Sequence, residues 1–343
     1  MENMHRVILI GAGPLGLKVA KFILERPNLA LVGVVDLNPD LAGKKLDDLV
    51  EGGSPDFAVS GTIAEALTAA GENVDAAVIT TVSSVRKILP TIREVADHKL
   101  PMVTTCEELS YPWVRHPVEA EEIDKVCREN GVACLGTGVN PGFLMDYLPS
   151  VLSAIHQRVD HVLVERVQDA SVRRVPFQKK IGAGLTHGEF SAAKENGTLR
   201  HVGLPESLDM IAAALGFDLD ESAETLEPVL APADLNVGYK PIRSGEPSGV
   251  EQIATGVLDG REVIRLRFRA AVGEEKSYDR IRITGNPGAE LEIKGGVNGD
   301  VATSAITVNA IRSAIRANPG LRTMLDSPVP ACFGGNVREM AAV

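Results

Sequence analysis

Three glycines and one acid near the N-terminus have the types and spacing of a dinucleotide-binding site. Gly11, Gly13 and Gly16 follow the apolar run 6–10, and Asp36 ends a second apolar run about 20 residues later. In such a pattern the first glycine permits a tight turn, the second lets the backbone approach a pyrophosphate, and the third allows close helix packing. The acid binds the adenosine ribose. The predicted cofactor contacts here are Gly11, Gly13, Pro14, Leu15, Gly16 and Asp36; a glycine-rich turn without a ligand is the alternative.

Two adjacent glutamates, Glu107 and Glu108, have the chemistry of a general acid or base. They follow the apolar segment 101–105, at a position where a strand would end. A carboxylate there, partly shielded by Tyr111 and Trp113, would lie near a bound nicotinamide and could exchange protons with a substrate. The alternative is that both glutamates lie in the first turn of a helix and only favour its dipole.

An alternation of strands and helices positions these groups. Apolar runs at 31–36, 76–80, 101–105 and 132–135 alternate with helical segments, among them 118–130, which Gly131 closes. This order is typical of a doubly wound parallel sheet, whose strand ends share one ligand-binding edge. The further cofactor contacts expected at that edge are Thr80, Thr81, Ser83, Cys106 and Asn140. The hydroxyl groups of 80–84 could instead cap the helix that begins at Val85.

The pattern changes after about residue 145. Alternating runs at 159–169, 252–258, 262–272, 278–284 and 290–294 predict antiparallel strands, with turns at Asp259-Gly260 and at 286–288. A final helix over 302–317, capped by Asp300, is expected to pack back on the first domain. We therefore predict an α/β protein: a Rossmann doubly wound parallel sheet (1–143), a second α+β domain with a mainly antiparallel sheet (144–300), and a returning C-terminal segment (301–343).

Composition excludes several classes of function. The formal net charge of −11 and the absence of a Lys/Arg cluster argue against nucleic acid as a partner. No apolar run approaches the roughly 18 residues of a spanning helix, and the first residues lack a signal-peptide pattern. We expect no membrane association and a soluble, cytoplasmic protein. The four cysteines lack zinc-site spacing and the seven histidines are scattered, so we expect no metal.

Three segments resemble a known family. They are the glycine motif with Val34-Val35-Asp36, Pro39 and Gly43-Lys44, then Thr104-Thr105-Cys106-Glu107-Glu108-Leu109-Ser110-Tyr111-Pro112, and Asn140-Pro141-Gly142-Phe143-Leu144-Met145-Asp146. Together they look like the 2,4-diaminopentanoate dehydrogenases and the related native amine dehydrogenases. The resemblance covers nearly the whole chain. Its N-terminal part is shared with dihydrodipicolinate reductase, so the glutamate and Asn-Pro-Gly-Phe segments are the specific ones.

The resemblance implies NAD(P)-dependent oxidative deamination of an amine, or the reverse reductive amination of a ketone or aldehyde with ammonia. The family's catalytic glutamate would map onto the doublet, with Glu108 preferred and Glu107 as the second choice. The implied substrate pocket includes Phe143, Met145, Phe177 and Thr303, while His187 either lines it or is a loop residue. A homodimer through the open sheet face of the second domain is also implied.

The choice of cofactor, substrate and reaction stays open at this point. Asp36 would accept from ribose hydroxyls and repel a 2′-phosphate, which favours NAD slightly, but Lys44 and Lys45 could reach the phosphate of NADP. A simple hydrophobic amine and a diamino acid, as in 2,4-diaminopentanoate dehydrogenase proper, fit equally. The other possibilities are an imine reductase like dihydrodipicolinate reductase, and a dinucleotide sensor without turnover.

Overall fold

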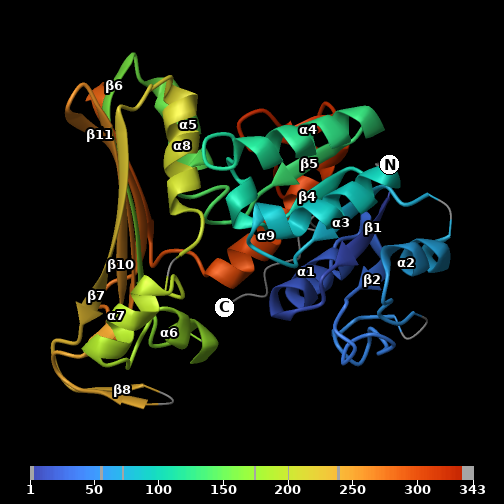
Figure 1. The fold of residues 1–343 in the computed structure, drawn as a ribbon, viewed down its shortest axis with the longest axis horizontal. Coiled ribbons are helices and arrows are strands. Elements are labelled where there is room, and N and C mark those ends of the chain that lie inside the picture. The colour runs from blue at the N-terminus through green and yellow to red at the C-terminus, as the bar shows by residue number, and fades with distance from the viewer. Residues whose placement is uncertain are drawn as a thin grey trace, which may run out of the picture. The chain divides into compact units, whose positions relative to one another are not determined.

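The computed structural model describes residues 4–333 except 55–56, 72, 174, 200 and 238–239, and it divides into two compact units (Figure 1). The first unit comprises residues 1–143 and 299–343, and the second comprises 144–298.

The first unit is built on a parallel sheet of six strands. These are β1 (His5–Ile10), β2 (Leu29–Val35), β3 (Ala76–Ile79), β4 (Met102–Thr104), β5 (Ala133–Gly136) and β14 (Gly320–Arg322), in the order β14-β5-β4-β3-β1-β2. The chain leaves β1 for β2 on one side and crosses to β3 on the other. The strand order therefore reverses between β1 and β3, which is where open α/β sheets bind ligands.

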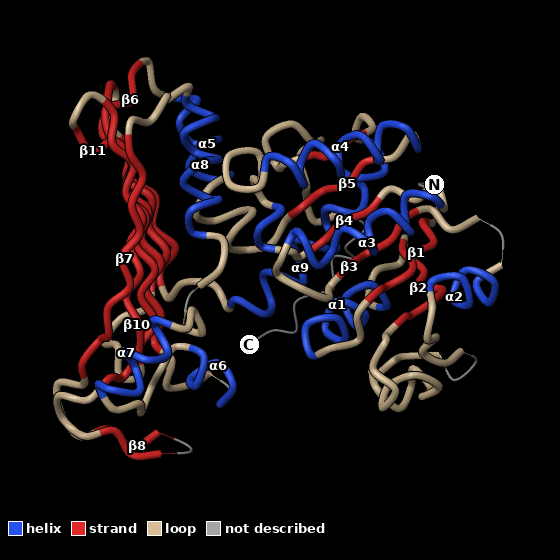
Figure 2. Tube along the Cα trace, in the orientation of Figure 1, coloured by secondary structure: helices blue, strands red, loops and turns tan. Residues whose placement is uncertain are grey.

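Helices cover both faces of this sheet (Figures 1 and 2). On one face, α1 (Pro14–Leu24) contacts β1 and β2, while α9 (Gly299–Arg316) contacts α1 and strands β3, β4 and β5. The other face holds α2 (Ile63–Ala70), α3 (Val85–Asp97) and α4 (Pro117–Asn130), whose apolar residues join those of the sheet in one core. Burial on both faces explains why β1 and β3 are nearly continuous apolar runs.

Local signals in this unit are mostly confirmed, with three differences. Gly131 ends α4 in the left-handed conformation, with φ 71°. The sequence Thr62-Ile63-Ala64-Glu65 has the pattern of a capping box, but only half of it forms: Thr62 accepts from the N–H of Glu65 at 3.2 Å, while the Glu65 carboxylate accepts from the N–H of Gly61 rather than that of Thr62. Asp300 lies inside the first turn of α9 instead of capping it. The short strand β14 was not predicted from the sequence.

The second unit contains a mixed sheet in the order β13-β12-β6-β11-β10-β7. Its strands are β6 (Arg158–Asp169), β7 (Glu221–Leu230), β10 (Pro247–Leu258), β11 (Arg261–Ala271), β12 (Tyr278–Asn286) and β13 (Ala289–Lys294), and a separate hairpin joins β8 (Leu235–Val237) to β9 (Lys240–Ile242). All pairs in the six-stranded sheet are antiparallel except β6 with β11. The sheet is therefore mainly antiparallel, as predicted, with one parallel pair that was not foreseen, and the predicted fold class is confirmed.

One face of this sheet packs on the unit's own helices. The helices are α5 (Tyr147–Leu152), α6 (Val175–Lys180), α7 (His187–Glu195) and α8 (Leu204–Leu215), with 3-10 turns at Ser153–Ile155 and, in the first unit, Glu107–Leu109. Asp146 joins two of the helices, because its carboxylate accepts from the N–H of Tyr147 at 2.7 Å and from the hydroxyl of Ser207 at 2.8 Å. The strands place apolar residues such as Val164, Leu266 and Ile281 on this inner face.

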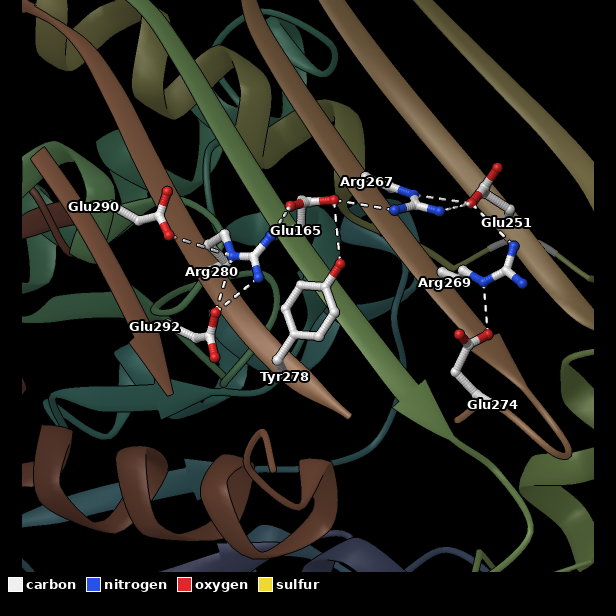
Figure 3. A network of polar contacts seen from close by, with 9 residues as sticks. All are labelled: Glu165, Glu251, Arg267, Arg269, Glu274, Tyr278, Arg280, Glu290 and Glu292. Carbon is white, nitrogen blue, oxygen red and sulfur yellow. Dashed lines mark hydrogen bonds and ion pairs between the residues drawn. The ribbon is translucent and has the colours of Figure 1, made fainter. Parts of the chain in front are cut away.

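The alternate strand positions carry a charged network on the opposite face (Figure 3). At its centre Glu165 accepts from Arg267 at 3.0 Å and from Arg280 at 3.3 Å. Arg267 also donates to Glu251, at 2.7 Å, and Arg280 to Glu292, at 2.8 Å. This network, named here the outer-face network, consists of Glu165, Glu251, Arg267, Arg269, Glu274, Tyr278, Arg280, Glu290 and Glu292.

Candidate cofactor and catalytic site

A pocket of about 540 Å³ opens where the strand order of the first sheet reverses. Five predicted cofactor residues line it: Gly11, Gly13, Asp36, Thr80 and Thr81. The other lining residues are Ile10, Val35, Leu37, Asn38, Leu41, Thr62, Ile63, Val82, Lys87, Thr91 and Glu94. A volume of several hundred Å³ is of the size that holds a drug-sized ligand or part of a dinucleotide.

The glycine loop has the geometry that its sequence requires. Gly11 has φ 103°, and a Cβ there would lie 2.9 Å from the carbonyl oxygen of Thr80. A Cβ on Gly16 would overlap the carbonyl oxygen of Gly11, so α1 can approach the loop only with glycine at this position. At Gly13, the N-cap of α1, a Cβ would meet no atom within 4 Å. The space beside Gly13 therefore suits a diphosphate at the helix N-terminus.

The Asp36 carboxylate is fixed by backbone groups at the edge of the pocket. It accepts from the N–H of Ala12 at 2.6 Å and from the N–H of Asn38 at 2.8 Å, one through each oxygen. A carboxylate held in this way presents its remaining lone pairs to a donor such as a ribose hydroxyl. Lys44 and Lys45 are exposed and absent from the lining, whereas Lys87 lines the pocket.

Two exposed apolar side chains belong to this pocket. Leu37, after β2, is 85% exposed, and Val82, after β3, is 36% exposed. Large apolar side chains that stay accessible beside a pocket are typical of ligand contacts, and a flat base such as adenine would cover them.

The glutamate doublet lies beside this pocket, and its two carboxylates differ. Glu108 Oε2 accepts from the backbone N–H of Val85 at 2.8 Å and lies 3.5 Å from Nε2 of His116. The N–H of Glu108 also donates to the carbonyl of Ser83 at 3.3 Å, next to Val82 of the pocket lining. Ser84, at the N-cap position of α3, makes no side-chain cap. The N-terminus of α3 is therefore capped by Glu108 and not by the hydroxyl groups considered for that role.

The Glu107 side chain is half-buried, and none of the described residues donates to its carboxylate or pairs with it. Its backbone carbonyl accepts from the hydroxyl of Ser110 at 2.9 Å. One carboxylate of the doublet is thus held in place, and the other has no protein partner in the part of the chain that is described.

Three further residues that were predicted to contact the cofactor or the substrate do not line this pocket. Cys106 is 1% exposed, with its thiol in the hydrophobic core, where burial raises its pKa. Its backbone, rather than its thiol, is the part that could meet a cofactor. Asn140 is buried and forms a cis peptide bond with Pro141. Thr303 of α9 supports this loop, since its hydroxyl accepts from the N–H of Val139 at 3.3 Å.

Two of the predicted substrate-pocket residues have their main contacts within the second unit. Met145 is fully buried beside a small apolar cavity with Leu148 and Val164, because it packs in the core of the second unit. His187 is exposed in the first turn of α7, where its Nε2 lies 2.9 Å from the carbonyl oxygen of Gly245. This position follows from a capping box formed by Thr186 and Glu189, a pattern that the sequence contains.

The remaining two predicted pocket residues are partly accessible. Phe143 is half-buried at the end of the first unit, and Phe177 is half-buried with the Arg173 guanidinium 4.2 Å above its ring.

The structure adds residues that were not predicted from the sequence. Lys87, Thr91 and Glu94 lie on one face of α3, and their helical spacing was a usable signal. His116 had no such signal, because nothing in the sequence relates it to Glu108. Among the described residues there is no group of three or more His, Cys, Asp or Glu side chains able to hold a metal ion. No helix in the described ranges is long and apolar enough to span a bilayer.

Comparisons with known proteins agree with this fold. A family model described as the 2,4-diaminopentanoate dehydrogenase C-terminal domain matches residues 143–343, and one described as a CoA binding domain matches residues 2–106. The chain is 31% identical to 2,4-diaminopentanoate dehydrogenase of Acetoanaerobium sticklandii over 347 residues, which cover 99% of this chain and 98% of the relative. It is 22% identical to an amine dehydrogenase of Streptomyces virginiae, with 96% and 98% covered.

A solved structure shows the same fold. The amine dehydrogenase from Mycobacterium smegmatis aligns with a TM-score of 0.82 at 23% identity, covering 96% of this chain and 98% of that one. The match extends over both units, and the resemblance inferred from the glycine, glutamate and Asn-Pro-Gly-Phe segments is confirmed. The chain belongs to the 2,4-diaminopentanoate dehydrogenase family.

Proposed function

We propose that this protein is an NAD(P)-dependent amine dehydrogenase. It would oxidise an amine to a ketone or aldehyde with release of ammonia, and would catalyse the reverse reductive amination. The observation that carries the proposal is the link between a dinucleotide-type pocket and a carboxylate: Glu108 donates its N–H to Ser83, one residue beyond Val82 of the pocket lining. Family membership supports the same activity.

The residues present fit a nicotinamide dinucleotide. Gly13 leaves space for the diphosphate, Asp36 offers acceptors to the ribose, and Leu37 with Val82 offers apolar surface to the adenine. When bound, the cofactor supplies the hydride acceptor, or the hydride donor in the reverse direction.

Glu108 is our choice for the acid-base group. Its contacts to Val85 and His116 both engage Oε2, which leaves Oε1 for a substrate. In the oxidative direction the carboxylate takes a proton from the substrate ammonium before hydride transfer. After that proton has passed to solvent, the carboxylate accepts a proton from the water that attacks the iminium carbon, and returns it to the departing ammonia. The balance is substrate ammonium, oxidised cofactor and water giving ketone, reduced cofactor, ammonium and one proton.

Glu107 is the second choice for the same role. Its carboxylate has no partner among the described residues, so it is available to a substrate without breaking a structural contact. Against it, no contact within the described ranges fixes its position, and a positioned group is the more effective proton carrier.

NAD is the proposed preference over NADP. The Asp36 carboxylate would repel a 2′-phosphate at close range, and it cannot readily turn away because each oxygen accepts from a backbone N–H. The lysines that could attract that phosphate, Lys44 and Lys45, do not line the pocket.

A substrate with a carboxylate is favoured over a simple hydrophobic amine. The Acetoanaerobium sticklandii relative is named for a diamino acid, which supports this class.

A homodimer through the outer-face network is part of the proposal. Glutamate and arginine alternate over this face (Figure 3), so a two-fold axis could set each charge against its opposite in a second copy. Sedimentation velocity at low and high salt tests this: a dimer that dissociates on Glu165→Arg is expected, and a monomer at all concentrations would contradict it.

Oxidation of NADH and NADPH against a panel of ketones, aldehydes and keto acids, each with and without ammonium, tests the activity. Ammonium-dependent oxidation, fastest with NADH and an amino keto acid, is the expected result. Ammonium-independent oxidation would indicate a carbonyl or imine reductase, and tight binding without turnover would indicate a dinucleotide sensor.

A further inference from the structure

We propose that His116 is a positioning residue that holds Glu108 and carries its proton to solvent. The inference rests on the proposed function, in which Glu108 is the acid-base group.

The imidazole of His116 is placed by its own backbone. His116 directly precedes α4; its N–H donates to the carbonyl of Pro112 at 2.8 Å, and its carbonyl accepts from Ala120 at 2.9 Å. Both backbone groups of the residue are therefore engaged, one in the preceding loop and one in the helix. These two bonds fix the backbone position from which the ring reaches Glu108.

The contact between the two side chains lies at the boundary of protein and solvent. Nε2 of His116 is 3.5 Å from Oε2 of Glu108, and each side chain is 21% exposed. The same oxygen accepts from Val85 at 2.8 Å. Oε2 thus faces the protein and the imidazole, and Oε1 is the oxygen left for a reacting molecule. A proton collected at Glu108 has the His116 ring in contact as its acceptor.

The charged groups near the pair include two further carboxylates, Arg86, and Arg115, which directly precedes His116. Glu107 is adjacent in sequence, and Glu119, in the first turn of α4, pairs with Arg86 of α3 at 2.6 Å. The positive form of His116 acts on Glu119 as well, since it contributes to lowering the pKa of that carboxyl, after the bonds to its backbone and to Arg86. Two carboxylates, Glu108 and Glu119, therefore attract a positive charge on this ring.

The proton path is balanced at each step. The protonated carboxyl group of Glu108 gives one proton to Nε2 of His116, which forms the imidazolium and restores the carboxylate. The imidazolium gives its Nδ1 proton to water and is left neutral with the proton on Nε2; proton exchange with solvent then returns the ring to the Nδ1-protonated tautomer before the next turnover. Oxidative deamination generates one proton per turnover beyond the ammonium, and this path disposes of it; in the reductive direction the path runs backwards.

Two variants and one control test the assignment. His116→Ala removes the ring, and His116→Gln keeps a hydrogen-bond donor near Oε2 but cannot carry a proton through. We expect kcat to fall roughly tenfold in both, part of the range of acid-base catalysis, with an unchanged dissociation constant for NADH. In His116→Ala, added imidazole at constant pH should restore kcat in proportion to its concentration. His98→Ala, which changes an exposed histidine at the end of α3, should keep the wild-type kcat and ignore imidazole.

Every outcome of this experiment either supports the proposal or overturns it. Wild-type kcat in His116→Ala, or a loss that imidazole does not reverse, would overturn the proposal while leaving the amine dehydrogenase activity standing. Absence of ammonium-dependent turnover in the wild type would overturn both. If His116→Ala fails to fold, His116→Gln carries the test, with wild-type kcat overturning the proposal and a roughly tenfold loss at wild-type thermal stability supporting it.

Discussion

The Glu108 carboxylate accepts the backbone N–H of Val85 at 2.8 Å, so a residue from the exit of β4 caps the helix that follows β3. The cap spans 23 residues of sequence and joins two neighbouring strand exits at the ligand edge of the sheet. One carboxylate thus has a structural contact and a proposed chemical role, and experiments have to separate the two.

Replacing Glu108 by glutamine separates them. The amide oxygen of Glu108→Gln can still accept from Val85 but cannot carry a proton, so activity should fall roughly 10² to 10⁴-fold with little change in stability. Glu108→Ala should lose the same activity and, in addition, about 1 kcal/mol of folding free energy with the cap. Steady-state kinetics and urea unfolding measure the two effects.

Glu107→Gln is the matched control for this experiment. It should retain wild-type stability, because its carboxylate has no partner among the described residues. Wild-type turnover in Glu108→Gln together with loss of turnover in Glu107→Gln would transfer the acid-base role to Glu107.

Two glycine variants should separate the glycine that the fold requires from the glycine that cofactor binding requires. In Gly16→Ala the new methyl group would overlap the Gly11 carbonyl, so we expect a loss of several kcal/mol in folding free energy or no folded protein. Gly13→Ala meets nothing within 4 Å and keeps an ordinary backbone conformation, with φ −68°.

Gly13→Ala should therefore fold like the wild type but bind NADH more weakly, because its methyl group occupies the space left for the diphosphate. Thermal unfolding and fluorescence titration with NADH give both quantities. Normal NADH affinity in a folded Gly13→Ala protein would be incompatible with a diphosphate at this helix terminus.

Asp36→Ser should change the balance between the two cofactors. The substitution removes the acceptor for the ribose hydroxyls, and the loss of a hydrogen bond to a charged group costs about 1.5–3 kcal/mol, or roughly 10- to 100-fold in NADH affinity. NADPH should lose less or gain, since the repulsion of its phosphate is gone. Dissociation constants for both cofactors, with Lys44→Ala as the comparison, test this; equal losses for both would show that Asp36 does not discriminate.

The lowered pKa of the half-buried His201 should make the protein less stable in acid. In the unfolded chain this group takes up a proton near pH 6.5, but its pKa in the folded chain is about 3. Between those values the unfolded state binds the additional proton, so the free energy of unfolding falls as the pH is lowered, at about 1.4 kcal/mol per pH unit. From pH 7 to pH 5 the contribution is about 2 kcal/mol.

His201→Phe should remove that pH dependence, and His187→Gln, at an exposed site, should not. Urea unfolding at the two pH values provides the comparison. A wild type and a His201→Phe variant with the same change between pH 7 and pH 5 would contradict a neutral imidazole in the folded protein.

The parts of the site whose chemistry is local could be predicted from the sequence. Gly11, Gly13, Gly16 and Asp36 are recognisable because each is needed for one contact within a single βαβ unit. Lys87 and Glu94 of α3 could also have been predicted, from their helical spacing, once α3 was placed beside the pocket.

Contacts between segments that are distant in the sequence could not be predicted. The cap from Glu108 to Val85 depends on the pairing of β3 with β4, and the position of His116 depends on how the loop before α4 turns; neither leaves a pattern in the chain. The parallel pairing of β6 with β11 was missed because alternation along a strand is the same for either direction. Met145 was assigned to the pocket from the Asn-Pro-Gly-Phe segment, but an apolar side chain there serves the core equally well.

The most direct test of the account uses isotope-labelled ammonium. The purified protein is incubated with NADH, a keto acid and ¹⁵N-ammonium, and the product is analysed by mass spectrometry while NADH is followed by absorbance. We expect one ¹⁵N-labelled amine for each NADH consumed, and none from the Glu108→Gln variant in the same time. NADH consumption that yields an unlabelled alcohol would contradict it.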